Sequence, residues 1–312
     1  MTLNDAVRPV TGAPAGGAPH EKPIRNPKRF AHWASYVLGL VVLAVAVRFF
    51  VFNPHWEWST VGAWLFSRRV LSGLLNTVLI TIVSTVAGLL LGLVVAAFRL
   101  SQLKVLRTMA AAYVWVIRAT PGLVLILFVY FFAALVPTLS LGLPFADPFV
   151  EVPTNHVISQ FSAAVIGLSA YLGAYSAEIF RGGVLSIHPG QFEACHSLGM
   201  STWRTYTKVV GPQIVRVITP SLANEVVTMF KNTSLVSVIG YVELLTTVQL
   251  VYSQNFKTIP MLTVAVVWYL VLTSLAMFGQ SKLEKRFGRG FARRVVQVPD
   301  AGEIPEQEAR HV

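Results

Sequence analysis

Long apolar runs separated by short polar segments dominate this 312-residue sequence. The run from Ala31 to Phe52 has about twenty residues, enough to cross a hydrocarbon core of about 30 Å as a helix. Similar runs predict further helices at about residues 71–98, 110–136, 157–180, 219–239 and 260–280. The pattern therefore predicts an all-α membrane protein with about six transmembrane helices.

Polar and small residues refine this prediction. The second predicted helix carries a stripe of small residues that favours close packing against another helix: Thr77, Thr81, Ser84, Gly88 and Gly92. The third is interrupted near Thr120–Pro121, because a proline removes a helical hydrogen bond. Residues 53–69 are amphipathic and predicted to lie at the membrane interface, whereas residues 241–257 are predicted to form an outer segment.

Composition and charge agree with a membrane protein. Hydrophobic residues make up 54% of the chain and charged residues only 12%. The net charge of +11 does not indicate nucleic-acid binding, because the basic residues fall in the gaps between apolar runs and not on one face. Predicted outer segments hold few of them, namely Arg48, Arg68, Arg69 and Lys257. This bias predicts that both termini are cytoplasmic.

The same features divide the chain into four predicted parts. Residues 1–30, rich in proline, glycine and alanine, are expected to form a flexible cytoplasmic tail. Residues 31–69 would add an N-terminal span and an interfacial segment. Residues 70–281 would form the core, including a cytoplasmic loop at residues 182–214. Residues 282–312 would form a basic cytoplasmic tail.

That loop contains the longest polar interruption in the second half of the chain. Gly190 lies where a short helix can start, and Gly199 can supply its left-handed end. A second helix can begin with Ser201 or Thr202 as its cap and end at Gly211–Pro212. The spacing predicts a helix-turn-helix outside the bilayer, with Glu193 and Ala194 on its exposed part. Such a helix is suited to docking in a partner's groove, although an ordinary interfacial loop has the same pattern.

The sequence predicts no catalytic residues and no metal site. It contains neither a Walker A phosphate loop nor a metalloprotease motif nor a cysteine pair, and its single cysteine is Cys195. If the protein moves a solute uphill, the energy must therefore enter through a partner or an ion gradient.

Charged groups within the predicted helices are candidates for gating, because burying them in a membrane is costly. They are Arg118, Glu178, Arg181 and Glu225. A structural salt bridge or a lipid headgroup contact explains Arg118 and Glu178 equally well.

Two polar stripes are candidates for a translocation path. Helical spacing places Leu168, Tyr171, Tyr175 and Glu178 on one stripe, and Ser221, Asn224, Thr228 and Lys231 on another. If these stripes face each other, or a second copy, they would line a wet path for a small zwitterion. The alternative is that these groups only bond neighbouring helices.

Several motifs resemble the permease subunits of ABC importers. Glu193–Ala194, Gly199 and residues 209–212 resemble the EAA motif of that family. YSAEIFRGGVLSIHPGQFEA (residues 175–194), FKNTSLVSVIG (residues 230–240) and RATP (residues 118–121) are similar to the polar amino acid subfamily, which includes histidine, glutamine and glutamate permeases. The resemblance covers roughly residues 73–278. Three small residues depart from the usual pattern: Ala119, Cys195 and Gly211, the last where a leucine is common.

The resemblance implies a MetI-like type I importer fold in the inner membrane of a prokaryote, surrounded by lipid. It implies a second permease copy or a paralogue, a cytoplasmic ABC ATPase dimer and an extracytoplasmic amino-acid-binding protein. ATP and magnesium would bind to the ATPase, and this chain would bind no cofactor and act as no enzyme. The ATPase would contact a loop that includes Gly190, Glu193, Ala194, Gly199 and Pro212, and a polar or charged amino acid would be carried.

Two other functions remain consistent with the residues alone. An ion-coupled secondary transporter of a small polar solute would use Glu178, Glu225 and Lys231 as coupling sites, and would need no ATP. A membrane scaffold would transport nothing.

Overall fold

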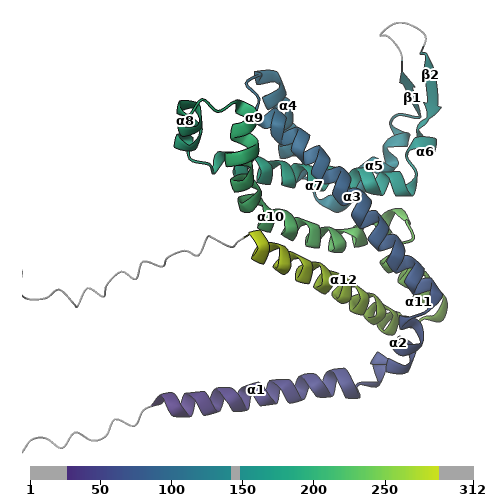
Figure 1. Cartoon of the computed structure of the whole chain (residues 1–312). Helices are drawn as coiled ribbons and strands as arrows, with labels where there is room; N and C mark the ends of the chain where they lie inside the picture. Colours follow the sequence, from purple (N-terminus) through teal and green to yellow (C-terminus); the bar gives the residue numbers. More distant parts are fainter. Residues whose placement is uncertain (1–26, 142–147, 288–312) are drawn as a thin grey trace, which may run out of the picture. The chain divides into compact units, whose positions relative to one another are not determined.

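The computed structural model describes residues 27–141 and 148–287, and this part of the chain is mainly helical (Figure 1). Its elements in chain order are α1 (Pro27–Phe52), η1 (Pro54–Trp56), α2 (Trp58–Leu65), α3 (Arg68–Leu100), α4 (Lys104–Ala119), α5 (Gly122–Tyr130), η2 (Phe131–Ala134), β1 (Thr138–Leu141), β2 (Val150–Pro153), α6 (Thr154–Val157), α7 (Gln160–Leu185), α8 (Pro189–Ser197), α9 (Thr202–Arg204), η3 (Thr205–Val210), α10 (Gly211–Asn232), η4 (Thr233–Ile239), α11 (Leu244–Asn255) and α12 (Thr258–Phe287).

Helix α1 belongs to a unit of its own, which ends at Pro54. The helix begins at Pro27, earlier than predicted, because proline fits the first turn of a helix, where its missing N–H is not needed. Residues 27–30, which were predicted as the end of the tail, are therefore helical. The rest of the predicted N-terminal tail, residues 1–26, and most of the basic C-terminal tail, residues 288–312, lie outside the described residues.

The number of spans agrees with the prediction if bent helices are included. Four helices are long and apolar enough to cross a membrane: His32–Phe52, Arg68–Leu100, Gln160–Leu185 and Thr258–Phe287. Two bent pairs pass the same test, α4 with α5–η2, and the helix from Thr202 to Ile239 with α11. Counting each pair as one span gives up to six.

The break predicted at Thr120–Pro121 is confirmed. Helix α4 ends at Ala119 and α5 begins at Gly122, and the two helices are bent by 108°. Thr120 is extended (φ −94°, ψ 131°), the conformation that a following proline favours.

Helices α3 and α7 pack closely through the predicted small-residue stripe. All five residues of that stripe are buried. At Gly88 a Cβ atom would lie 2.8 Å from the Cβ of Leu172 on α7, so only glycine allows the two helices to approach this closely. The Ser169 hydroxyl on α7 donates to the carbonyl of Ser84 on α3 (3.1 Å). Close contact of small residues is a common basis of helix association in lipid.

Three apolar clusters form the core of the unit that begins at His55. The first joins α3, α5, α7, α10 and η4 and includes Ile80, Ile126 and Leu172. The second joins α2, α3, α11 and α12, and the third joins α3, α4 and α7. Helices α3 and α7 thus form the centre against which the other helices pack.

Helix α11 and the hairpin of β1 and β2 were not predicted. The segment from Tyr241 to Lys257, predicted as an outer segment, contains the helix α11, whose residues Leu244, Val248 and Val251 are buried in the second cluster. Its polar residues lower the mean hydropathy of the segment, so a hydropathy argument does not detect its apolar face. In addition, β1 and β2 form an antiparallel hairpin in which Thr138 pairs with Pro153, so the fold is not purely helical.

Candidate functional site

The first helix of the predicted loop forms as expected. Helix α8 spans Pro189–Ser197, and the His188 side chain caps it by accepting a hydrogen bond from the Gly190 N–H (3.1 Å). Gly199 follows with φ +67°, the left-handed conformation that glycine adopts without a steric penalty. The glycine at this position thus ends the helix and turns the chain.

The surface of α8 suits a docking element. Glu193 and Ala194 are exposed, as predicted, and Leu198 is 79% exposed. Cys195 is buried on the opposite side, and the rings of Phe192 and Tyr206 pack edge to face at 5.9 Å. Helix α8 is therefore fixed by its apolar side and presents an acidic and an apolar residue outward.

The second helix of the loop does not end at Gly211–Pro212, contrary to the prediction. Ser201 caps it by accepting from the Arg204 N–H (3.4 Å), and the chain then stays helical through α9, η3 and α10 up to Asn232. Pro212 is tolerated because it lies at the start of α10, after a π-helical turn formed by η3. The loop is thus directly continuous with the helix predicted to start near residue 219.

A cavity of about 590 Å³ lies where α4, α7 and α10 meet. It is lined by Arg118, Tyr175, Glu178, Ile179, Pro220, Ser221, Asn224 and Glu225. A neighbouring cavity of about 470 Å³ shares Arg118, Tyr175 and Glu178 and adds Arg99 and Trp115. The structure therefore brings residues of both predicted polar stripes to one place, together with three of the four predicted charged residues.

The acidic group of this cavity on α7 is already paired. Glu178 accepts from Arg99 on α3 (3.2 Å) and from Arg181 one turn further along α7 (2.7 Å). These pairs agree with the structural salt bridge considered for Glu178, and Arg99 is a partner that the sequence did not indicate. This cluster ties the ends of α3 and α7 together.

Unlike the carboxylate of Glu178, the charged groups of Arg118 and Glu225 are not paired in a salt bridge with any described residue, and they line the cavity. The Arg118 guanidinium lies over the Tyr175 ring, 5.0 Å from its centroid, and the Tyr175 ring packs against Tyr171 at 4.6 Å. Glu225 makes no salt bridge within residues 27–141 and 148–287. The cavity thus contains a cation held on an aromatic surface and a carboxylate free to accept a donor.

Other members of the stripes lie elsewhere. Leu168 is buried in the first core cluster, because its turn of α7 faces the other helices. Thr228 does not line either cavity, and its hydroxyl bonds the Asn224 carbonyl in its own helix (3.0 Å). Lys231 is exposed near the end of α10. Whether these residues meet a solute stays a prediction.

Sequence reasoning missed the carboxylate of Glu243, which precedes α11. It is fully buried and caps α11 by accepting from the N–H groups of Leu245 (2.9 Å) and Thr246 (2.8 Å). It also accepts from the Tyr269 hydroxyl on α12 (2.7 Å) and the Thr77 hydroxyl on α3 (3.4 Å). The only signal in the sequence was an acidic residue next to an apolar run. Glu243 joins three helices and lies outside both cavities.

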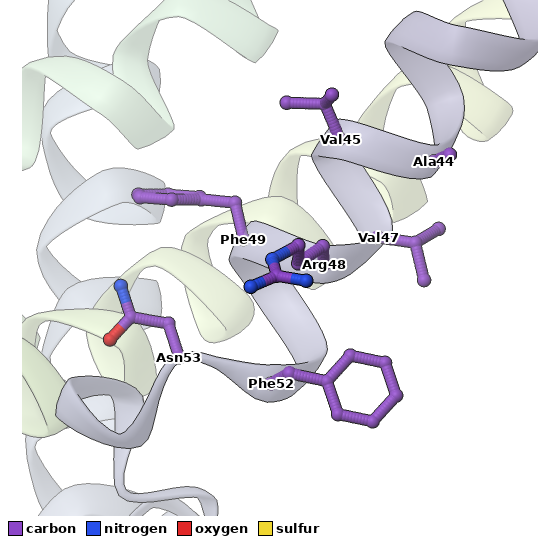
Figure 2. Close-up of a pocket in the computed structure, with 7 residues that line it drawn as sticks. All are labelled: Ala44, Val45, Val47, Arg48, Phe49, Phe52 and Asn53. Carbon is purple, nitrogen blue, oxygen red and sulfur yellow. The ribbon is translucent and has the colours of Figure 1, made fainter.

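A larger hollow lies on α1 and is shown in Figure 2. Its lining is mostly aliphatic and aromatic, with Arg48 as its one charged residue, and it comes from consecutive turns of one helix and the residue that follows. A polar solute needs polar groups that converge from several directions. The cavity of α4, α7 and α10 meets this requirement better.

Comparison with known proteins places the chain in a family. Residues 88–289 match the family described as binding-protein-dependent transport system inner membrane component. The chain is 36% identical over 293 residues to the arginine transport system permease protein ArgU of Corynebacterium glutamicum, covering 91% of this chain and 90% of the relative. It is 32% identical to the glutamine transport system permease protein GlnP of Escherichia coli K12, covering 74% of this chain and 98% of the relative.

Solved structures agree. The crystal structure of an amino acid ABC transporter with histidines matches with a TM-score of 0.59 and 32% identity, over 70% of this chain and 94% of that chain. An inward-facing structure of the MetNI methionine ABC transporter matches with a TM-score of 0.50 at 21% identity, which supports the MetI-like fold alone. The chain belongs to the family of binding-protein-dependent transport system inner membrane components, and it is a permease subunit of an ABC importer.

Proposed function

We propose that this permease subunit moves a polar or charged amino acid through the cavity of α4, α7 and α10. The observation that carries the proposal is the presence of both signs of charge in that cavity, Arg118 and Glu225, beside Tyr175 and Asn224. Arg118 can donate to the carboxylate of a zwitterion, and Glu225 can accept from its ammonium group or from a basic side chain. The named functions of ArgU and GlnP, arginine and glutamine transport, support this substrate class.

The energy is proposed to come from a separate ATPase dimer that binds α8 on the cytoplasmic side. ATP and magnesium would bind to those subunits. The exposed Glu193 and Leu198 suit such a contact, and Gly190, Ala194, Gly199 and Pro212 shape it. Helix α8 packs against η3 through Phe192 and Tyr206, and η3 is continuous with α10. Closure of the ATPase dimer would therefore move α10 and change access to the cavity.

The complete transporter is proposed to contain a second copy of this chain or a paralogue, and an extracytoplasmic amino-acid-binding protein. It would lie in the cytoplasmic membrane of a prokaryote with both termini in the cytoplasm. Two permease subunits would place two cavities near one pathway, and the binding protein would deliver the amino acid from the opposite side to α8.

Transport assays with purified components test this proposal. The permease, its ATPase and its binding protein are reconstituted into liposomes, and uptake of labelled arginine, histidine, glutamine and glutamate is measured. We expect uptake of at least one of them with ATP and magnesium, and none when the ATPase or the binding protein is omitted. Uptake by the permease alone, driven by a proton or sodium gradient without nucleotide, would show instead an ion-coupled transporter.

A further inference from the structure

The segment that joins α8 to the cavity-lining helix has an unusual geometry. η3 (Thr205–Val210) is a π-helix, and it continues into α10 without leaving helical backbone conformation. At its end the N–H of Gly211 donates to the carbonyl oxygen of Tyr206, five residues earlier. Turns of this kind are rare and occur frequently at functional sites.

Gly211 is the residue that permits this turn. A Cβ atom on Gly211 would lie 2.3 Å from the carbonyl oxygen of Tyr206, which is closer than real Cβ contacts. The obstructing atom belongs to the backbone, so rotation of a side chain would not relieve the clash. Any other residue would force the backbone to move, and an ordinary α-helical turn is the nearest alternative.

The turn sets the position of α8, because α8 is contacted by one residue within the turn and by one residue beyond it. Tyr206, within the turn, packs against Phe192 of α8 at 5.9 Å. Gln213, beyond the turn, donates from Nε2 to Oε1 of Gln191 on α8 (3.4 Å). Each residue rotates an α-helix by about 100°. If η3 became α-helical at the same chain length, Tyr206 and Gln213 would rotate relative to each other by about this angle and could not both keep their contacts.

Beyond the turn, α10 is held firmly against α7. A Cβ atom on Gly183 of α7 would lie 2.2 Å from Cγ2 of Ile218 on α10, so the two helices are in close contact there. From this tightly packed region α10 continues to Asn224 and Glu225 in the cavity. A rotation at η3 would therefore move α8 relative to a fixed α10.

We propose that Gly211 is a positioning residue for transport. It maintains the π-turn that fixes the rotation of α8 relative to α10, and so determines whether movement of α8 is passed to the cavity. The consequence for transport rests on the proposed function of α8 as the ATPase contact, whereas the effect on geometry does not.

The test compares three changes in the full chain. Gly211→Ala should return η3 to an α-helical turn and shift α8. The second change combines Gly211→Ala with deletion of Thr207, an exposed residue of η3. An α-helical turn contains one residue fewer than the π-turn, so this deletion should bring Tyr206 and Gln213 back to the same side of the helix, facing α8. Gly182→Ala on α7 is the matched control, since a Cβ atom there would meet no atom within 4 Å.

The first readout is geometric and independent of transport. Cysteines are introduced by Gln191→Cys and Gln213→Cys in a Cys195→Ser background, and cross-linking by a short thiol-reactive bifunctional reagent is measured on the purified permease in nanodiscs. The reagent spans the length of the two glutamine side chains, which touch only at their ends. We expect cross-linking in the otherwise unchanged chain and in the Gly182→Ala control. It should be lost with Gly211→Ala and return when Thr207 is also deleted.

The second readout is coupling in the reconstituted transporter without the introduced cysteines. Gly211→Ala should lower the amount of amino acid moved per ATP by at least about tenfold while the ATPase subunits stay bound, because small displacements of working groups cost this much. Deletion of Thr207 should restore it. Unchanged cross-linking with Gly211→Ala, or no recovery after deletion, would overturn the proposal. The two proposals can fail separately. If the unchanged chain transports no amino acid but cross-linking follows the expected pattern, the proposed function is contradicted and the role of Gly211 in the geometry still holds.

Discussion

Gly199→Val and Glu193→Trp are each expected to abolish stable binding of the ATPase subunits to the permease. Gly199 has φ +67°, a conformation that a β-branched residue adopts only with strain, so valine would redirect the chain after α8. Glu193 is exposed on α8, where a bulky ring would prevent close contact with a groove. Loss of one central contact costs about 2 kcal/mol or more, which is roughly thirtyfold in affinity.

Co-purification of the ATPase with tagged permease measures this effect. The matched control is Gly279→Val on α12, because an added Cβ atom there meets no atom within 4 Å. The melting temperature of each variant shows whether the helical bundle is intact, which we expect since both residues lie outside the three core clusters. If both variants bind the ATPase as the unchanged chain does, α8 is not the docking element.

Glu243→Ala is expected to destabilise the permease strongly without any contact with the solute. Its carboxylate accepts from two N–H groups of α11 and from hydroxyls of α3 and α12, and these donors are buried or partly buried. Alanine would leave buried donors without partners, at about 1–3 kcal/mol for each group that finds no other acceptor. We expect a total loss of about 3 kcal/mol, or a fall in melting temperature of roughly 10 °C.

The conservative change Glu243→Gln gives the comparison. Glutamine keeps an acceptor oxygen of similar reach, so it should lose less than half as much stability as alanine. Thermal unfolding in detergent, followed by intrinsic fluorescence, measures both. Equal melting temperatures for the alanine variant and the unchanged chain would show that this hydrogen-bond network does not hold the three helices together.

Much of the fold could be predicted because membrane helices must be both long and apolar. This requirement located α3, α7 and α12, and proline chemistry located the break at Thr120–Pro121. Glycine geometry likewise predicted the end of α8 at Gly199. These features depend on local sequence, so a single chain is sufficient to find them.

The features that were missed depend on contacts between distant residues. Glu178 pairs with Arg99, 79 positions away, and no local pattern indicates this partner. The sequence did not indicate helix α11 because its polar side chains pack against distant helices. Thr247, for example, lies so close to Gly73 of α3 that a Cβ atom on Gly73 would be 2.4 Å from its Oγ1. The helix continues through Gly211–Pro212 because a π-turn precedes the proline, whereas the sequence alone predicts a helix end there.

The same distinction applies to the candidate site. The stripe positions Tyr175 and Asn224 could be predicted from helical spacing and do line one cavity. Lys231 has the same spacing but is exposed, since periodicity gives the face of a helix and not how far along it a neighbour extends. Arg118 lies in the cavity because α4 ends at Ala119, and this end of the helix lies beside α7 and α10.

The central claim is that α8 receives force from an ATPase on the cytoplasmic side of the membrane. It is tested by introducing Leu198→Cys into a Cys195→Ser background, where the exposed position 198 carries the only cysteine. Vesicles of known orientation are then treated with a membrane-impermeant maleimide. We predict labelling from the cytoplasmic side alone, and protection from labelling when the ATPase subunits are added. Labelling from the external side, or no protection by the ATPase, would contradict the account.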